Sequence, residues 1–378
     1  MSPSILRLPY QALAYLSPKH RQDAQWTYRQ ALANAVLKSG LEIYTGLRIN
    51  PSLSLKPGHE KRRFVLIEPG NPLLYAGAAH DDKIKPETIG ATWYPDTYHV
   101  RDYDRADCEY VMLYLHGGSY VLGNGRTLTC RYLTTTLLQN TPCCYILSVQ
   151  YRLACNKNGR FPAQLQDAIT AYSYLVHTLR IPASRIVLSG DSSGAHLALA
   201  LLRHIAYLKE FHGRKEDDHV SINKALLPPP KCTWAFSPWC DVPAARDPNC
   251  WTSSPRFKSE YIPGSFPAWG AQKFLDDLEI TEFIEQYVAP IKHPFLLPSP
   301  VLVVTGGREV LCEEHKELVQ SYRSLPRNES RIEVFVEENV PHDVLMIAWI
   351  MNFHGEARTC ACQAGKFLLR RETRETNE

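Results

Sequence analysis

The chain has 378 residues, 44% of them hydrophobic and 21% charged, so it can bury a sizeable core in one large α/β domain or two smaller ones. Its formal net charge of +3, with no basic block or basic-aromatic array, does not indicate a nucleic-acid partner or a charged membrane surface. No apolar run approaches the roughly 18–20 residues of a membrane span, and residues 1–15 lack the pattern of a secretory signal. We therefore expect a cytoplasmic protein without a membrane span.

The 11 cysteines do not have the spacing of a disulfide framework. Cys143 and Cys144 are adjacent in a strand-like run, and Cys360-x-Cys362 lies in an expected C-terminal helix. No second pair of ligands completes a tetrahedral metal site. We expect reduced, mostly buried thiols, no metal and no other cofactor.

Residues 1–60 have a polar, helical pattern that is clearest from 20 to 39, with Gly40 as a natural stop. An apolar stripe runs along this segment: Trp26, Leu32, Val36 and Leu37. Such a helix either packs against the rest of the protein or caps a pocket, and the sequence leaves both open.

Short apolar runs then alternate with helical patterns. Strands are expected at residues 64–67, 91–95, 110–115, 143–151, 185–188, 231–236, 301–305 and 332–336. Helices are expected at residues 162–178, 193–209, 313–322 and 344–349. This alternation predicts the α/β class, with a mostly parallel eight-stranded sheet that has helices on both faces. Ligands of such sheets bind at the carboxyl ends of the strands.

Residues 242–298 interrupt the alternation with a segment rich in Pro, Trp, Tyr and Phe and one helical pattern at 272–287. Long insertions in compact folds commonly serve function, so we favour a substrate-covering lid over a simple packing excursion. The expected division is a helical cap segment at 1–60, a catalytic core at 61–241 and 299–372, a cap insertion at 242–298 and a disordered tail at 373–378.

The strand at 185–188 runs into Gly190-Asp191-Ser192-Ser193-Gly194, a G-x-S-x-G turn that lifts a serine out of a parallel sheet. The turn is strained and brings strand and helix close together, so glycine is needed two residues before and two residues after the serine. A serine hydroxyl is a weak nucleophile near neutral pH and needs a base within hydrogen-bond reach. Since chance often supplies this motif, its partners must decide whether Ser192 is catalytic.

His342 is the candidate base, because it follows the last strand and so reaches the same sheet end as Ser192. His196 lies on the helix after the turn, where we expect it to pack. Glu309 is the candidate acid, as the first carboxylate after the strand at 301–305, although a solvated loop glutamate has the same pattern. Asp343 is the alternative acid, but a side chain next in sequence to a histidine seldom points at the ring nitrogens of that histidine.

Donors for an oxyanion are expected in His116-Gly117-Gly118-Ser119, which directly follows a strand. Gly117 and Gly118 would supply two backbone N–H groups and Ser193 a third, while His116 would brace the loop. Each such donor is typically worth about 3–4 kcal/mol in the transition state.

The motifs together resemble the hormone-sensitive-lipase-like branch of the α/β-hydrolases, from about residue 111 to His342. The glycine loop and the turn at Ser192 are similar to that branch's oxyanion loop and G-D-S-A-G elbow. Its remaining signatures correspond to Tyr151-Arg152-Leu153-Ala154, Phe161-Pro162-Ala163, Asp167-Ala168 and Ser237-Pro238-Trp239-x-Asp241. The resemblance implies a Ser192–Glu309–His342 triad in the family's chain order and a cap built from an N-terminal segment and an insertion.

Three positions depart from the family pattern. Ser119 stands where a third glycine is usual, which affects how bulky acyl groups fit. Ser193 replaces alanine and keeps its N–H available, and Glu309 replaces aspartate with a longer arm that still reaches His342.

A looser resemblance, through Trp93-Tyr94-Pro95 and the overall layout, is to fungal hydrolases of natural-product biosynthesis, and it implies a polyketide-derived substrate. The leading hypothesis is a serine carboxylesterase that forms an acyl-enzyme on Ser192. One alternative is a biosynthetic enzyme that condenses or cyclises an intermediate without net hydrolysis. A non-catalytic ligand receptor is disfavoured because His342 is in register. Oligomeric state and pathway lie beyond the sequence.

Overall fold

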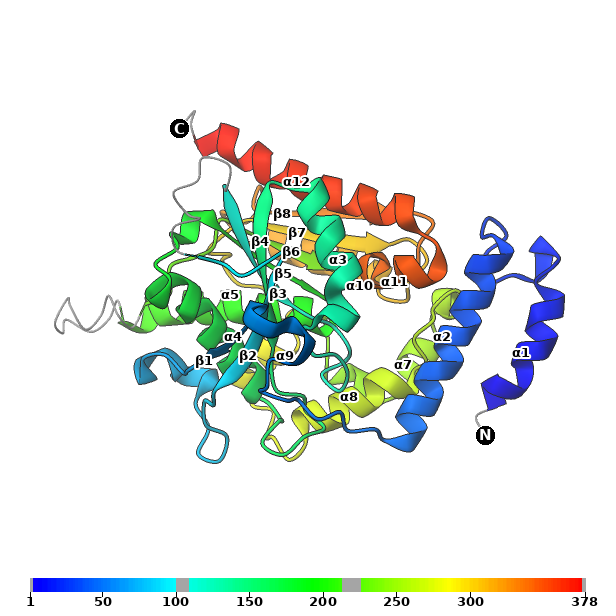
Figure 1. Cartoon of the computed structure of the whole chain (residues 1–378), viewed down its shortest axis with the longest axis horizontal. Helices are drawn as coiled ribbons and strands as arrows, with labels where there is room; N and C mark the ends of the chain where they lie inside the picture. The colour runs from blue at the N-terminus through cyan, green and yellow to red at the C-terminus, as the bar shows by residue number, and fades with distance from the viewer. Residues whose placement is uncertain (1–2, 100–108, 213–225, 376–378) are drawn as a thin grey trace.

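The structure is a computed structural model and describes residues 3–99, 109–212 and 226–375. Its centre is one eight-stranded sheet with the strand order β1-β2-β4-β3-β5-β6-β7-β8 (Figure 1). The strands are β1 (Phe64–Ile67), β2 (Ile89–Tyr94), β3 (Tyr110–Leu115), β4 (Cys143–Gln150), β5 (Ile186–Asp191), β6 (Cys232–Phe236), β7 (Val301–Gly306) and β8 (Ile332–Glu337). The sheet pairs β1 with β2 and β2 with β4 in antiparallel fashion, and all other pairs are parallel. The predicted mostly parallel eight-stranded sheet is confirmed.

Side chains of the central strands alternate between two cores, one on each face of the sheet. In β3, Val111, Leu113 and Leu115 belong to one core, whereas Tyr110, Met112 and Tyr114 belong to the other. Every residue of β3 is buried, so the strand reads as a continuous apolar run. This two-sided burial is what holds the strand ends still enough to position a site.

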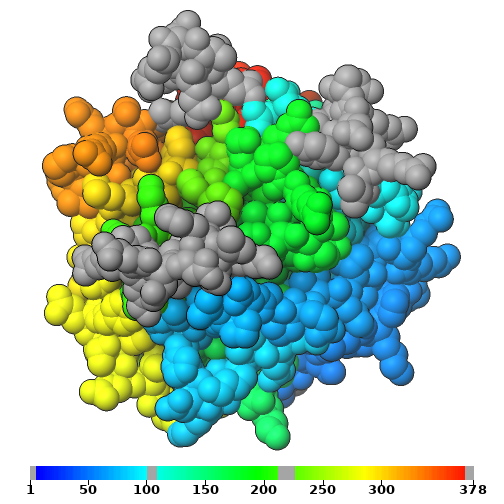
Figure 2. Space-filling model, turned by 90° about the vertical axis from the view of Figure 1, so that its left-hand side faces the viewer, coloured from blue at the N-terminus to red at the C-terminus, as the bar shows by residue number. Residues whose placement is uncertain are grey.

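The α-helices are α1 (Pro3–Ala14), α2 (Tyr28–Leu47), α3 (Thr127–Asn140), α4 (Ala163–Ser173), α5 (Ser193–His212), α7 (Asn249–Thr252), α8 (Ser265–Leu275), α9 (Glu282–Val288), α10 (Cys312–Arg323), α11 (Val344–Met351) and α12 (His354–Glu375). Helices α3, α11 and α12 contact one another on one face of the sheet. On the other face α4 packs on α5, and α10 contributes to the same core. Figure 2 views the end opposite α1, where the blue segment around β1 and the yellow segment around α9 lie side by side.

Several predicted boundaries are wrong for identifiable reasons. Helix α2 begins at Tyr28, where Thr27 and Gln30 form a capping box, and it passes through Gly40 to Leu47. No side chain or backbone atom crowds a Cβ at Gly40, so that glycine does not mark a stop. The pattern at 272–287 is two helices, α8 and α9, separated by Asp276 with φ 30°.

Two further features were not expected. Helix α3 was missed because its threonine-rich sequence has a weak apolar stripe. Cys144 is disulfide-bonded, which corrects the expectation of reduced thiols at that position, while the other described cysteines are free. Sequence spacing does not reveal such a bond, because it depends on which cysteines become neighbours in space.

The C-terminal helix α12 continues to Glu375, so residues 373–375 of the expected disordered tail are helical. Residues 376–378 lie outside the described residues. In the described ranges, no helix has the length and apolarity to cross a bilayer.

Contacts tie α2 to the segment around α7 and to the sheet's carboxyl edge. Asn34 donates to the Ser259 carbonyl at 2.8 Å, and Lys38 donates to the Glu260 carbonyl at 3.0 Å. Trp26 is buried and donates through Nε1 to the Asn339 carbonyl at 2.8 Å. The N-terminal segment therefore lies against residues of the insertion, close to the ends of the strands.

Candidate active site

Ser192 occupies the sharp turn between β5 and α5, with φ 51°. A Cβ on Gly190 would lie 2.4 Å from the Gly194 carbonyl oxygen, and a Cβ on Gly194 would lie 2.0 Å from the Leu115 carbonyl oxygen. Neither glycine can be replaced without moving backbone. The Ser192 amide donates to the Phe236 carbonyl at 2.8 Å, which anchors the turn to the neighbouring strand. This geometry is the strained elbow that the motif predicts.

The glycine loop after β3 lies beside this elbow. Gly118 has φ 110°, and a Cβ there would lie 2.3 Å from the Leu122 carbonyl oxygen. His116 is buried, its ring stacks on Tyr151 with centroids 4.1 Å apart, and its Nδ1 lies 2.8 Å from the Gly117 carbonyl. These contacts hold His116 between Tyr151 and the backbone of the glycine loop, which is consistent with the predicted supporting role of His116.

The Gly117 amide, a predicted oxyanion donor, is already used in a hydrogen bond within the protein. It donates to Asp191 Oδ1 at 2.9 Å, and the Tyr114 hydroxyl hydrogen-bonds the same oxygen. The amides of Gly118, Ser119 and Ser193 form no hydrogen bond to another described residue. Because Gly118 and Ser119 line the same cavity as Ser192, their N–H groups are better placed than that of Gly117 for an oxyanion.

His342 lies in the loop after β8 and faces Glu309 from the loop after β7. Its Nδ1 lies 2.7 Å from Glu309 Oε2, and both side chains are buried. Its Nε2 is buried and has no hydrogen-bond partner among the described residues. His342 and Ser192 line the same cavity. A loose serine–histidine contact is common in ligand-free sites.

The other candidates lie elsewhere. Asp343, the alternative acid, does not bond the His342 ring, whereas Glu309 does. His196 Nδ1 pairs with the Tyr120 hydroxyl, and burial lowers the pKa of His196 to about 4, so its imidazole stays neutral and packs as expected.

A polar network that the sequence did not suggest holds Glu309 in place. Its Oε1 accepts hydrogen bonds from the Gly306 amide at 2.7 Å, from Thr305 Oγ1 at 2.5 Å and from Ser237 Oγ at 3.1 Å. Thr305 Oγ1 also lies 2.6 Å from His315 Nδ1. The carboxylate therefore keeps one oxygen for His342 while the other is fully engaged. Ser237 belongs to the S-P-W-x-D signature, and that motif is the one sequence feature that could have pointed to its hydrogen bond with Glu309.

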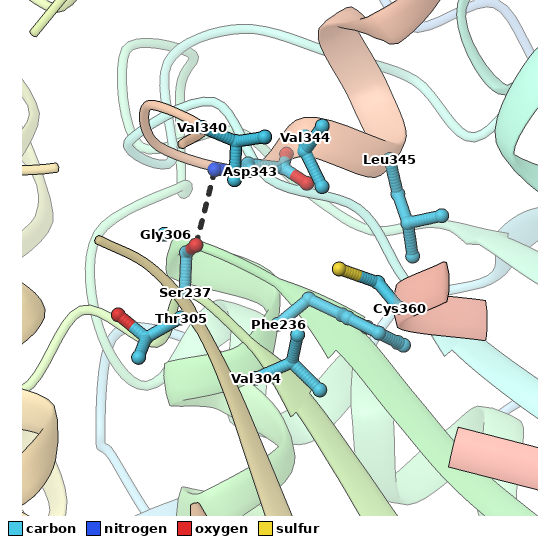
Figure 3. Close-up of a pocket in the computed structure, with 10 residues that line it drawn as sticks. All are labelled: Phe236, Ser237, Val304, Thr305, Gly306, Val340, Asp343, Val344, Leu345 and Cys360. Carbon is cyan, nitrogen blue, oxygen red and sulfur yellow. Dashed lines mark hydrogen bonds between the residues drawn. The ribbon is translucent and has the colours of Figure 1, made fainter. Parts of the chain in front are cut away.

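Ser237 also reaches the histidine loop. Its Oγ accepts a hydrogen bond from the Asp343 amide at 3.0 Å, drawn as the dashed line in Figure 3. Figure 3 shows that these two residues line a small pocket together with apolar side chains that include Phe236, Val304 and Leu345. One serine thus connects the acid and the segment that carries the base.

The charges around His342 favour its protonated form. Burial alone would lower the pKa of His342, but the hydrogen bond and charge of Glu309, with the charge of Glu260, raise it above the ordinary 6.5. Burial alone would raise the pKa of Glu309, yet His315 and His342 hold it well below its usual range. Glu309 therefore stays ionised and can stabilise an imidazolium at His342.

Two carboxyl groups meet beneath the nucleophile. Asp343 is buried near Asp191 and has an Oδ1 without a hydrogen-bond partner among the described residues. Burial, followed by the charge of Asp191, raises the pKa of Asp343 well above its ordinary value. Burial and the neighbouring charge of Asp191 thus both favour the protonated form of Asp343.

The cavity over Ser192 has a volume of about 200 Å³. Helix α2 contributes Leu37 and Leu41 to its wall, and the insertion contributes Tyr261, Ile262 and Phe266. Helix α11 adds Met346 and Ile347. The reacting groups thus face an apolar chamber walled by both segments expected to form a cap. Among the described residues, no three His, Cys, Asp or Glu side chains gather in a way that could hold a metal ion.

A family model described as alpha/beta hydrolase fold matches residues 112–346, and the chain belongs to that family. The predicted family is therefore confirmed.

Curated relatives and a solved structure extend the comparison. An acetyl-hydrolase of Streptomyces hygroscopicus is 28% identical over 220 residues, which cover 56% of this chain and 60% of that protein. An ethyl acetate hydrolase of Pseudomonas putida is 30% identical over 172 residues, covering 43% of this chain and 51% of that one. The chain thus aligns with only about half of the length of these relatives. The crystal structure of an esterase from the bacterial hormone-sensitive lipase family superposes with a TM-score of 0.56 at 20% identity, over 98% of this chain and 99% of the other, which establishes the shared fold.

Proposed function

We propose that the protein is a serine carboxylic-ester hydrolase that forms an acyl-enzyme on Ser192. The observation that carries this proposal is the 2.7 Å contact between Glu309 and His342 Nδ1, with His342 Nε2 unpartnered at the cavity that Ser192 also lines. A buried histidine oriented by a buried carboxylate supports the role of general base.

In the first half-reaction His342 takes the Ser192 proton as Oγ attacks the ester carbonyl carbon. The negative charge that develops on the carbonyl oxygen is met by the amides of Gly118, Ser119 and Ser193. The C–O bond to the alcohol then breaks, and the His342 imidazolium returns its proton to the departing alkoxide. In the second half-reaction His342 deprotonates a water as it attacks the acyl carbon. The bond between that carbon and Ser192 Oγ then breaks, and the His342 imidazolium returns its proton to Oγ, which releases the acid and regenerates Ser192.

The acyl group we propose is short and apolar. An apolar protein cavity of about 150 Å³ holds a benzene molecule, so a chamber of about 200 Å³ suits a small chain or ring. The names of two relatives, an acetyl-hydrolase and an ethyl acetate hydrolase, agree with small ester groups. The polyketide-derived substrate and the cytoplasmic location stay predictions.

We assign the cap to residues 1–60 and 242–298, on the catalytic core formed by residues 61–241 and 299–372. Its support is the wall of the cavity, to which α2 and the insertion both contribute apolar side chains. Closing a chamber over the nucleophile excludes water and strengthens the oxyanion contacts.

The test combines covalent labelling with turnover. A fluorophosphonate probe should label Ser192, and Ser192→Ala should lose both labelling and hydrolysis of p-nitrophenyl butyrate. A control, Ser324→Ala, changes a serine at the end of α10 and should keep full activity. Full turnover by Ser192→Ala would contradict the proposal. Tight ligand binding by the wild type without labelling would favour a receptor, and loss of water from a polyketide precursor, seen by mass spectrometry, would favour condensation.

A further inference from the structure

Helix α1 has two different faces. Toward α2, Leu8 and the buried Tyr15 pack with Ala31 and Ala35. On the opposite face, Leu6, Tyr10 and Leu13 are 68%, 72% and 72% exposed. Their spacing of four and three residues places these three side chains in one row along the helix. The fold thus leaves a row of large apolar side chains outside its core.

This row, which we call the α1 stripe (Leu6, Tyr10 and Leu13), lies at the outer edge of the molecule. In Figure 1 α2 lies between α1 and the rest of the protein, and α1 packs on α2. Leu16, just beyond the helix, is 65% exposed and prolongs the apolar surface. Isolated exposed leucines are ordinary on protein surfaces, but an aligned group on one helix marks an interaction site.

The charges around the α1 stripe are positive. Residues 3–30 contain Arg7, Lys19, Arg21 and Arg29, and their one acid, Asp23, forms an ion pair with Arg308 at 2.5 Å. Arg7 and Lys19 are exposed. A second copy of the chain docking stripe to stripe would bring these like charges together, which costs binding energy. An anionic lipid surface satisfies both the apolar row and the cations.

We propose that α1 docks in the plane of an anionic lipid surface, with the α1 stripe among the acyl chains and Arg7 and Lys19 at the headgroups. The chain's small net charge conceals this property, because it depends on where the few cations of one segment lie in the fold. Docking would leave α2, which supplies Leu37 and Leu41 to the cavity, one helix away from the lipid. The proposal does not depend on the chemistry at Ser192.

The experiment uses the full chain and extruded vesicles of phosphatidylcholine with about one third phosphatidylserine. Cosedimentation should show binding that falls with salt and is lost with phosphatidylcholine alone. Leu6→Ser combined with Leu13→Ser should weaken binding at least about tenfold, since both apolar groups leave the interface. The matched control, Leu73→Ser with Leu296→Ser, changes two leucines that are 49% and 51% exposed elsewhere and should bind as the wild type.

Arg7→Glu with Lys19→Glu should remove most of the salt-sensitive part of the binding. Circular dichroism and thermal unfolding confirm that each variant is folded. No vesicle binding by the wild type, or equal binding by the stripe variant, would overturn the proposal. A wild-type dimer that the stripe variant converts to a monomer, without vesicle binding, would also overturn it and assign the α1 stripe to a second copy of the chain.

Discussion

At the scale of single residues, the site depends on how each polar atom is occupied. Glu309 uses one oxygen for His342 and the other for the Gly306 amide, Thr305 and Ser237. The Gly117 amide is engaged by Asp191, so it does not serve as a free donor. A residue's place in a motif therefore does not decide its role, because a hydrogen bond already made within the protein removes an atom from the chemistry.

Glu309→Gln should lower kcat/KM for p-nitrophenyl butyrate about 10³- to 10⁴-fold, since a neutral amide neither orients nor stabilises the imidazolium. The acid limb of the pH profile should move as well. His342 acts only when neutral, and Glu309 raises its pKa, so wild-type activity should fall as pH drops through a value above 6.5. In Glu309→Gln this midpoint should move to lower pH. Glu313→Gln, a change of an exposed carboxylate on α10, should leave both readouts unchanged, and a wild-type midpoint below 6.5 would contradict the assignment.

Asp343→Asn should make the protein relatively more stable as pH rises. The pKa of Asp343 is raised in the folded state above its unfolded value of about 3.9. The folded wild type therefore holds this proton more tightly than the unfolded chain, and its stability falls as pH rises from the unfolded pKa toward the folded one. An asparagine has a similar shape and no proton to lose. Thermal denaturation of the two proteins from acid to alkaline pH measures this. The unfolding midpoint of the variant should rise relative to that of the wild type as the pH increases. A difference in unfolding midpoint that does not change with pH would contradict the raised pKa of Asp343.

At the scale of elements, the chamber over Ser192 is made by segments far apart in the chain. Helix α2 is tied to the insertion by Asn34 and Lys38, which donate to backbone carbonyls at Ser259 and Glu260. These hydrogen bonds align Leu37 and Leu41 opposite Tyr261 and its neighbours. The helix boundaries expected in these two segments moved because caps and tertiary contacts override local propensity.

Leu41→Trp should shift the acyl preference toward shorter chains. The larger ring occupies part of the 200 Å³ cavity, so p-nitrophenyl acetate should be kept while longer esters lose kcat/KM about tenfold or more. Val36→Trp is the matched control, because Val36 is half exposed on the same helix and does not line the cavity. Equal losses across the ester series in Leu41→Trp would contradict this role for α2.

At the scale of the whole molecule, a buried ion pair joins the end of β4 to α4. Arg152 donates to Asp167 at 2.7 Å through Nη2 and at 3.0 Å through Nε, and the Asp167 side chain is fully buried. The Arg152 amide also donates to Asp167 at 2.7 Å. This pair lies in the Y-R-L-A and D-A signatures, which gives those motifs a structural purpose away from the chemistry.

Asp167→Ala should lower the free energy of unfolding by about 3–5 kcal/mol, because it removes the buried partner of Arg152 and leaves that charge only the more exposed Glu87, at 3.6 Å. Asp277→Ala removes an exposed carboxylate that pairs with Arg160, and should cost about 1 kcal/mol or less. Urea denaturation of the two variants measures the contrast. Similar losses for both would show that burial of the Arg152–Asp167 pair adds nothing.

The sequence by itself determined the fold class, the positions of the eight strands and the elbow at Ser192, and it supplied the candidates for the base and the acid. These features are local or ordered along the chain: apolar runs make strands, glycines mark the strained turn, and strand ends bring Ser192, Glu309 and His342 to one edge. Only the tertiary structure decided the engagement of Gly117 by Asp191, the role of Ser237, the disulfide at Cys144 and the α1 stripe. Each of these depends on which atoms from distant segments become neighbours, and a hydrogen bond or an uncovered side chain has no signature in the spacing of residues along one chain.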